Sequence, residues 1–236
     1  MTLESFFYAY LWGMVILGVG IFITLQFITP AYGMTYNNRW GASISSRWGW
    51  LIMETPVFVI MLIIYLNSLL TGVKTFNIVT FIFLLIFQTH YLQRSFIFPA
   101  LMKGQSRMPL SIMFAGIFFN ASNAFIQGGW LFMFAPANAY PISWFWSPQF
   151  IIGCVLFFIG MVINIKSDRI IRKLRKSRDD NNYYLPQGFL FKYINSSNYF
   201  GEIIEWIGFA ILTWSIPGLV FVIWSIANIL PRSKAV

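Results

Sequence analysis

Long apolar runs are the feature that most restricts how this chain can fold. Several reach about twenty residues, the length that a helix needs to cross the hydrocarbon core of a bilayer. Charged residues make up only 10% of the 236 residues and hydrophobic residues 58%, whereas a soluble domain carries about 25% charged residues. The sequence therefore predicts an all-α integral membrane protein that forms a single domain over residues 1–236.

The apolar runs divide into seven predicted transmembrane helices. Their approximate ranges are 6–28, 49–71, 76–98, 110–134 and 149–168, followed by two helices that share 199–230. Pro217 and Gly218 mark the expected break between the last two helices, because proline interrupts a helix. The first run follows Glu4 and has neither a basic segment before it nor a small-residue cleavage site, so we expect a retained helix rather than a cleaved signal peptide.

The distribution of lysine and arginine predicts the orientation in the membrane. Loops one, three and five hold most of these residues, including the cluster from Arg169 to Arg178, whereas loops two and four hold Lys74 alone. Positively charged loops face the cytoplasm. We therefore expect the N-terminus outside and the C-terminus in the cytoplasm, in agreement with Arg232 and Lys234. The same rule accounts for the net charge of +9, so no nucleic-acid partner is expected.

Metal chemistry and disulfides are not expected from the residue types present. Cys154 is the single cysteine and His90 the single histidine. A disulfide framework needs paired cysteines, and protein-bound zinc needs several nitrogen or sulfur ligands. No metal site is therefore predicted.

Two polar stripes interrupt the apolar pattern late in the chain. The first has the helical spacing i, i+4, i+8, i+11 and consists of Asn164, Asp168, Arg172 and Arg175. The second has the spacing i, i+4, i+7 and consists of Asn198, Glu202 and Glu205. Residues at such spacings share one face of a helix. Two facing stripes at the membrane border predict a site for a large, charged, hydrogen-bonding ligand.

Further ionisable residues of the predicted spans lie near the same cytoplasmic ends. They are Glu54, Tyr91 and Arg94. Insertion of an ionisable group into a membrane span costs roughly 2.5–3.5 kcal/mol, so such groups usually mark functional sites. Each also has a structural interpretation. In this interpretation, Glu54 is an acidic residue in the first turn of a helix, favoured by the helix dipole. Tyr91 belongs to the aromatic belt at the membrane surface, and Arg94 reaches the lipid headgroups. The face formed by Asn120, Asn123 and Gln127 suits hydrogen bonds between helices.

Long motifs in the chain resemble those of the steroid 5α-reductase family. The C-terminal half contains I-N-I-K-S-D-R-I-I-R-K-L-R-K (163–176), Y-Y-L-P-Q-G-F-L-F-K-Y-I (183–194) and N-Y-F-G-E-I-I-E-W-I-G-F-A-I-L-T-W-S-I-P (198–217). The N-terminal half contains A-Y-G (31–33), M-E-T-P (53–56), H-Y-L-Q-R-S-F-I-F (90–98) and N-A-F-I-Q-G (123–128). The resemblance covers almost the whole chain, and the motifs occur in the family's order.

The resemblance implies a seven-helix enzyme that uses NADPH to reduce the 4,5 double bond of a 3-oxo-4-ene steroid. Tyr91 would donate a hydrogen bond to the 3-keto oxygen, where negative charge develops during hydride transfer. Glu54 would pair with Tyr91, as a second donor or by orienting its hydroxyl. Trp50 matches a position that lines the steroid pocket. The substrate residues would thus lie mainly in 1–135.

The resemblance also implies that the two polar stripes bind NADPH, within a C-terminal half that spans 149–236. The positions matching its cofactor contacts are Asn164, Asp168, Arg175, Tyr183, Asn198 and Glu202. Guanidinium groups bind phosphates well, and the arginines expected to bind the phosphates of NADPH are Arg94, Arg175 and Arg232. The chain contains no G-x-G-x-x-G motif, so a Rossmann site is not expected.

Two departures from the family pattern stand out. Met53 occupies a position where the family commonly has glutamine, which would alter hydrogen bonding near Glu54. The family also usually continues past the position of Arg232 with a tail rich in His, Arg and Tyr, whereas this sequence stops at Val236. We expect any cofactor contact made by that tail to be missing here.

Other functions remain open at this point. One is a reductase of another lipid enone or of a polyprenol, and another is a membrane methyltransferase of the isoprenylcysteine type, which would use S-adenosylmethionine. A third is a seven-span transporter. It would show polar sites at mid-membrane and broken helices in repeated halves, whereas the polar residues here gather at one face of the membrane. We expect a monomer, surrounded by membrane lipid, in either the bacterial inner membrane or the endoplasmic reticulum membrane.

Overall fold

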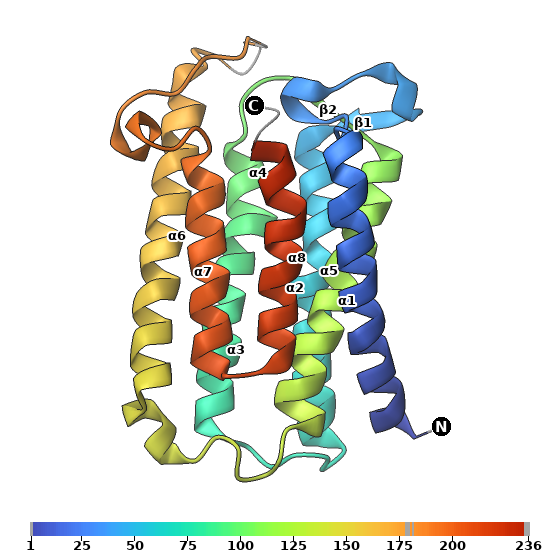
Figure 1. Cartoon of the computed structure of the whole chain (residues 1–236), viewed down its shortest axis with the longest axis vertical. Helices are drawn as coiled ribbons and strands as arrows, with labels where there is room; N and C mark the ends of the chain where they lie inside the picture. The colour runs from blue at the N-terminus through green and yellow to red at the C-terminus, as the bar shows by residue number, and fades with distance from the viewer. Residues whose placement is uncertain (1, 178–179, 181, 234–236) are drawn as a thin grey trace.

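The computed structural model describes residues 2–177, 180 and 182–233. Arg178 and Lys234, which contributed to the predicted orientation, lie outside this described part. The long helices lie side by side, and their loops gather in two layers at the two ends of the bundle (Figure 1). The α-helices are α1 (Leu3–Phe27), α2 (Ser46–Leu70), α3 (Ile78–Tyr91), α4 (Phe98–Leu101), α5 (Leu110–Gly129), α6 (Pro148–Leu174), α7 (Ser197–Thr213) and α8 (Ile216–Ser233).

Shorter helical segments extend or connect these helices. The π-helix η3 (Leu92–Ile97) joins α3 to α4, and the π-helix η4 (Trp130–Phe134) continues α5. Short 3-10 turns lie in the loops at η1 (Gly33–Thr35), η2 (Asn38–Trp40), η5 (Ile142–Trp146) and η6 (Phe189–Lys192).

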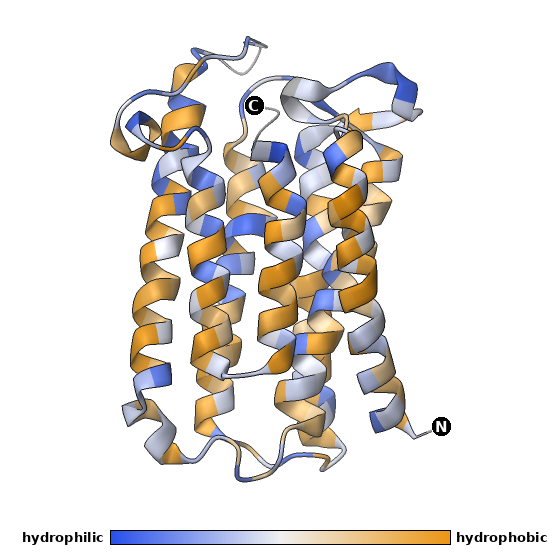
Figure 2. Cartoon of the chain, in the orientation of Figure 1, coloured by the Kyte–Doolittle hydropathy of each residue, from blue (hydrophilic) through white to orange (hydrophobic). Residues whose placement is uncertain are grey.

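Apolar side chains cover much of the outside of the bundle, as expected for a protein in lipid. Within the residues that the structure describes, five helices are long and apolar enough to cross a membrane: α1, α2, α5 with η4, α6 and α8. Orange, hydrophobic residues predominate along the middle of the helices in Figure 2, and blue residues are more frequent near the ends. Ile16 and Val162 are 74% and 61% exposed, although water would disfavour them there. The chain is thus a multi-pass, α-helical membrane protein.

A helix lies at the position of each predicted span, but in the described part of the chain only five of these helices have the length and hydropathy of a membrane-crossing helix. One predicted range also differs clearly in length. The helix predicted over 149–168 continues to Leu174, because its last turns are polar and periodic rather than apolar. The third and sixth predicted spans correspond to α3, of 14 residues before η3, and α7, of 17 residues.

The break between the last two helices lies before Pro217, not at it. Trp214 ends α7 in the left-handed conformation with φ 45°. Pro217 falls in the first turn of α8, where its missing N–H costs nothing. The Ser215 hydroxyl accepts a hydrogen bond from the Gly218 N–H at 3.1 Å and caps the new helix.

A small β-ribbon, which the hydropathy pattern did not predict, joins two loops at one end of the bundle. Strand β1 (Ser43–Ser45) pairs antiparallel with β2 (Arg107–Pro109), with Ile44 opposite Met108. Arg107 Nε also donates to the Ser43 hydroxyl at 2.9 Å. Strands of three residues are too short to produce a recognisable alternating pattern.

Helices α6 and α7 pack with their backbones in close contact. Glycines on the two helices face each other there, and a Cβ on Gly201 would lie 2.6 Å from the Asn164 backbone nitrogen. Small residues let helix backbones approach in this way. The pairing places the polar stripe of α6 directly beside that of α7.

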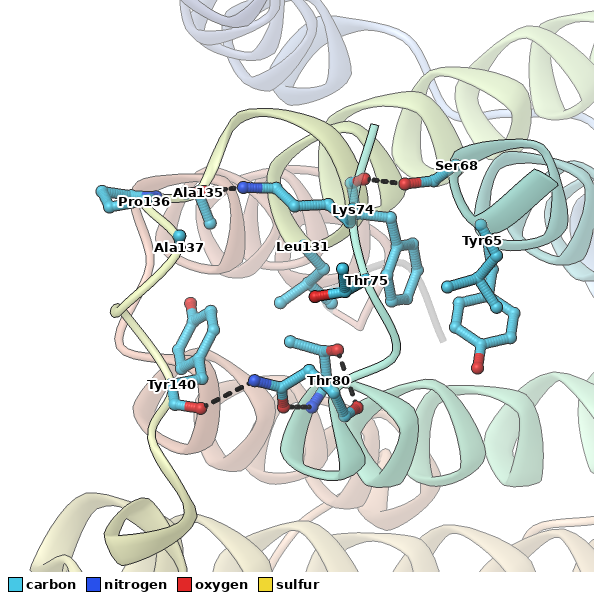
Figure 3. A pocket seen from close by; sticks show the side chains of 13 residues that line it. Tyr65, Ser68, Lys74, Thr75, Thr80, Leu131, Ala135, Pro136, Ala137 and Tyr140 are labelled. Atoms are coloured by element: carbon cyan, nitrogen blue, oxygen red, sulfur yellow. Dashed lines mark hydrogen bonds between the residues drawn. The ribbon is translucent and has the colours of Figure 1, made fainter. Parts of the chain in front are cut away.

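A small hollow of about 70 Å³ lies at the other end of the bundle, between the α2–α3 loop and the loop after η4. Figure 3 shows the Lys74 ammonium pointing at the Ala135 carbonyl, to which it donates a hydrogen bond. Asn77 Nδ2 donates to the Tyr140 carbonyl at 3.0 Å, and the Tyr140 hydroxyl donates to the Thr213 carbonyl at 2.7 Å. Burial raises the pKa of Tyr140 to about 12, so this donor keeps its proton. These bonds tie the loops together.

Candidate functional site

A large cavity of about 810 Å³ opens among the helix ends on the side of the β-ribbon. This volume lies within the range of ligand pockets, which is about 300–1,000 Å³. Of the predicted site residues, those that line the cavity are Trp50, Glu54, Tyr91, Arg94, Asp168, Arg175, Tyr183, Asn198, Glu202 and Arg232. The structure thus brings together residues from α2, α3, η3, α6, α7, α8 and the loop after α6.

Tyr91 lies at the end of α3 and is almost completely buried, with 2% of its surface exposed. Its hydroxyl oxygen accepts a hydrogen bond from Asn123 Nδ2 at 2.8 Å. The Glu54 carboxyl faces the same cavity from α2, beside the Asn120 amide. The direct partner of the tyrosine hydroxyl is therefore Asn123 on α5, and the expected pairing of Glu54 with Tyr91 stays a prediction.

The π-helix η3 turns several polar side chains inward directly after Tyr91. Gln93, Arg94 and Ser95 are all buried, and the Ser95 hydroxyl donates to the Glu54 carbonyl at 2.9 Å. The wider turn of the π-helix is typical of functional sites and explains how a lipid-exposed helix presents so much polarity to the cavity.

Arg94 lies between acidic residues of both polar stripes. Its Nη1 is 3.4 Å from Asp168 Oδ2, and its Nη2 is 3.5 Å from Glu202 Oε2. The guanidinium also lies 4.6 Å from the ring centre of Trp50. A buried charge needs such partners, and this arrangement fixes Trp50 at the cavity wall.

The two stripes face each other, as their spacing predicted. Asn164 Nδ2 donates to the Asn198 carbonyl at 3.0 Å and lies 3.5 Å from Glu202 Oε2. Asn164 is 3% exposed, and the lining of the cavity, as far as the described residues form it, does not include Asn164. The structure thus places Asn164 behind Asn198 and Glu202, where it joins α6 to α7.

Basic side chains surround the mouth of the cavity. Arg172 lines it, and its buried Nη1 has no hydrogen-bond partner in the described part of the chain. Arg175 donates to the Lys103 carbonyl and stacks 5.0 Å from the Tyr183 ring. Arg232 lies 3.3 Å above the Tyr32 ring. A buried guanidinium nitrogen without a partner among the described residues suits an anionic ligand, so this end of the cavity suits an anionic group such as a phosphate.

The loop after α6 holds its shape through Asp180. Its carboxylate accepts from the backbone N–H groups of Lys176 and Asn182 at 3.0 and 3.1 Å and from the Tyr184 hydroxyl. The Lys176 N–H holds the pKa of this exposed carboxyl below its usual value. Asp180 therefore stays ionised near neutral pH and positions Asn182 and Tyr184 at the cavity mouth.

Several residues of the site were not predicted from the sequence. Arg172 belonged to the first polar stripe but was not assigned to the cofactor. Asn123 was interpreted as a contact between helices, and its bond to Tyr91 is invisible without the fold. His90 lines the cavity and bonds to Glu205, although a lone histidine gave no signal beyond the absence of a metal cluster.

The sequence of the chain is similar to those of known steroid-reducing enzymes. The sequence pattern of the 3-oxo-5-alpha-steroid 4-dehydrogenase family matches residues 106–236. The chain is 35% identical over 213 residues to 3-oxo-5-alpha-steroid 4-dehydrogenase 1 of Rattus norvegicus, covering 90% of this chain and 80% of the relative. The chain belongs to the 3-oxo-5-alpha-steroid 4-dehydrogenase family. The expected family is therefore confirmed, and the chain is an oxidoreductase.

Members of the 3-oxo-5-alpha-steroid 4-dehydrogenase family from plants align over even more of the chain. Steroid 5-alpha-reductase DET2 of Solanum lycopersicum is 33% identical over 234 residues, which is 98% of this chain and 88% of the relative. The 3-oxo-5-alpha-steroid 4-dehydrogenase 1 of Homo sapiens is 33% identical over 92% of this chain and 82% of the relative. The similarity thus includes both halves of the cavity.

Proposed function

We propose that the protein reduces the 4,5 double bond of a 3-oxo-4-ene steroid, with NADPH as the hydride donor. Family membership supports the reaction class. The observation that carries the proposal is the Tyr91 hydroxyl, held at the cavity by Asn123. Apolar walls suit a steroid skeleton, and they include Leu25, Phe119, Phe221 and Trp224.

Tyr91 would polarise the enone through its hydroxyl proton. Because Asn123 donates to the hydroxyl oxygen, it leaves the O–H free to donate to the ketone oxygen of the substrate. Negative charge grows on that oxygen as the β-carbon is reduced, and a preplaced donor stabilises it. Glu54 would act beside Tyr91, as a second donor or by orienting the hydroxyl.

The polar end of the cavity would hold the cofactor. A bound nicotinamide would supply the hydride. Arg172, Arg175 and Arg232 would bind its phosphates, because guanidinium groups match phosphate geometry. Asn198 and Glu202 suit hydroxyl and amide groups, and Asn164 would keep both in position. The predicted contacts of Arg94, Asp168 and Tyr183 with the cofactor are part of the same proposal.

We further propose that α3 with η3 and α7 also cross the membrane, which gives seven spans. The N-terminus would lie outside and the C-terminus in the cytoplasm, since basic residues gather around the cavity mouth. Substrate contacts would come mainly from 1–135 and NADPH contacts from 149–236. A monomer suffices, because one chain encloses the cavity.

The proposal is tested with detergent-purified protein, NADPH and testosterone or progesterone, both 3-oxo-4-ene steroids. We expect NADPH oxidation together with a 5α-reduced product, identified by mass spectrometry. Cofactor binding without a reduced steroid would favour another lipid enone as substrate. Binding of S-adenosylmethionine instead of NADPH would favour the methyltransferase alternative.

Glu202→Ala is expected to weaken NADPH binding about 10- to 100-fold, because hydrogen bonds to charged groups contribute about 1.5–3 kcal/mol. The change removes a cavity carboxylate that also contacts Arg94 and Asn164. Titration of protein fluorescence with NADPH measures the affinity. Glu4→Ala is the control, because Glu4 lies exposed in the first turn of α1. Unchanged affinity in Glu202→Ala would remove Glu202 from the proposed cofactor site.

A further inference from the structure

His90 and Glu205 form a buried pair at the cavity that the proposed role of Tyr91 does not use. His90 Nδ1 lies 2.8 Å from Glu205 Oε1, and the two residues are only 4% and 1% exposed. Helix α3 provides the histidine and α7 the carboxylate, so the bond spans 115 residues of sequence. Burial of such a pair costs desolvation energy, and no described residue forms a hydrogen bond with Glu205 Oε2.

The packing fixes the orientation of the imidazole. Its ring centre lies 4.5 Å from that of Trp206 and 4.8 Å from that of Tyr91, with both contacts edge to face. His90 lines the cavity, whereas Glu205 is not among the described residues that line it. With Nδ1 held by the carboxylate, Nε2 is the ring nitrogen left for the cavity. A carboxylate behind an imidazole is the arrangement by which proteins set the tautomer of a catalytic histidine.

The reduction of an enone needs a proton as well as a hydride. Tyr91 is placed to hold the ketone oxygen, and the carbon that takes up the proton is bonded directly to the carbonyl carbon. A donor for this carbon must therefore lie close to Tyr91. His90 precedes Tyr91 in the chain and contacts its ring. The other charged groups that act on the imidazole are Glu54 on α2, Arg94 on η3 and Glu202 on α7.

We propose that His90, oriented by Glu205, delivers the proton to the α-carbon of the substrate; this inference rests on the proposed function. Hydride addition at the β-carbon moves the π electrons of the double bond onto the enolate. The enolate electron pair then forms the C–H bond at the α-carbon while the Nε2–H bond of the imidazolium breaks. The imidazole is left neutral with its Nδ1–H on Glu205, and water at the cavity mouth returns the proton.

Because His90 is the only histidine, its ring gives a single set of signals in the NMR spectrum of protein labelled with ¹⁵N-histidine. We expect a protonated Nδ1 whose resonance shifts in Glu205→Gln. Addition of an unreactive 3-oxo steroid together with NADP⁺ should shift the Nε2 resonance. An Nε2 resonance that ignores both ligands would overturn the proposal, whatever the variants do.

His90→Gln is expected to lower kcat about 100-fold or more, since general acids contribute about 10²- to 10⁴-fold. Protonation should then limit the rate. The solvent deuterium isotope effect on kcat should rise, and that from deuterated NADPH should fall. Loss of a histidine with only a structural role would not raise the solvent isotope effect while lowering the isotope effect from deuterated NADPH. Glu205→Gln should lower kcat less, with the same direction of change.

Thr89→Ala is the matched control, because Thr89 precedes His90 but is exposed on the outside of α3. Its kcat and both isotope effects should match those of the wild-type protein. Unchanged kcat in His90→Gln, with active wild-type protein, would overturn only the role of His90. Wild-type protein that reduces no enone would overturn the proposed function and this inference with it. If His90→Gln does not fold, the NMR result for the wild-type protein decides.

Discussion

Tyr91→Phe is expected to lower the turnover of a 3-oxo-4-ene steroid about 10²- to 10³-fold, the effect of removing one oxyanion donor from an enzyme. Phenylalanine keeps the ring that packs 4.7 Å from Phe87 and 5.7 Å from Trp206, so the cavity wall should stay intact. Only the O–H donor to the ketone oxygen is lost. The affinity for NADPH should therefore remain nearly unchanged.

Steady-state kcat and a separate fluorescence titration with NADPH measure the two effects of Tyr91→Phe. Asn123→Ala provides the internal control, because Asn123 acts on the reaction through the Tyr91 hydroxyl. Its loss of activity should appear in the wild-type background and vanish in the Tyr91→Phe background, as coupled residues behave in a double-mutant cycle. Equal losses of turnover and NADPH affinity in Tyr91→Phe would contradict the assigned role.

The membrane fold and the stripes were predictable because both depend on local periodicity. Hydropathy located the helices, since each run must satisfy its own backbone hydrogen bonds in lipid. The spacing of Asp168 and Asn164 on one helix, and of Glu202 and Asn198 on the next, placed these residues on shared faces. Because α6 and α7 follow each other in the chain and pack side by side, their two polar faces lie against each other.

The remaining features depend on contacts between distant segments, which periodicity does not encode. Asn123 and Tyr91 are 32 residues apart, and His90 and Glu205 are 115 apart. The π-helix after Tyr91 changes which residues face inward, so an α-helical projection misplaces them. Pro217 marked a helix start rather than a break, because proline is favoured in the first helical turn. Only the packed structure distinguishes these cases.

Gly160→Ala is expected to disrupt the site from behind, by forcing α6 away from α7. An added Cβ would overlap the Glu205 backbone nitrogen and lie 2.6 Å from the Gly201 carbonyl oxygen. Neither backbone atom can rotate away as a side chain does. Overpacking of this kind costs about 1–3 kcal/mol of stability. Separation of the helices would also lengthen the 3.0 Å bond from Asn164 to the Asn198 carbonyl.

Thermal unfolding in detergent and NADPH titration measure both consequences of Gly160→Ala. We expect a lower melting temperature and weaker NADPH binding in the same variant, because the helix pairing positions the cofactor residues. Gly20→Ala is the control. An added Cβ at Gly20 meets no atom of the described residues within 4 Å, and alanine stabilises a helix interior by up to about 1 kcal/mol relative to glycine. A Gly160→Ala protein with the melting temperature and NADPH affinity of the wild type would contradict this prediction. It would show that α6 and α7 lie further apart than the described contacts require, and the two polar stripes could then not share one ligand.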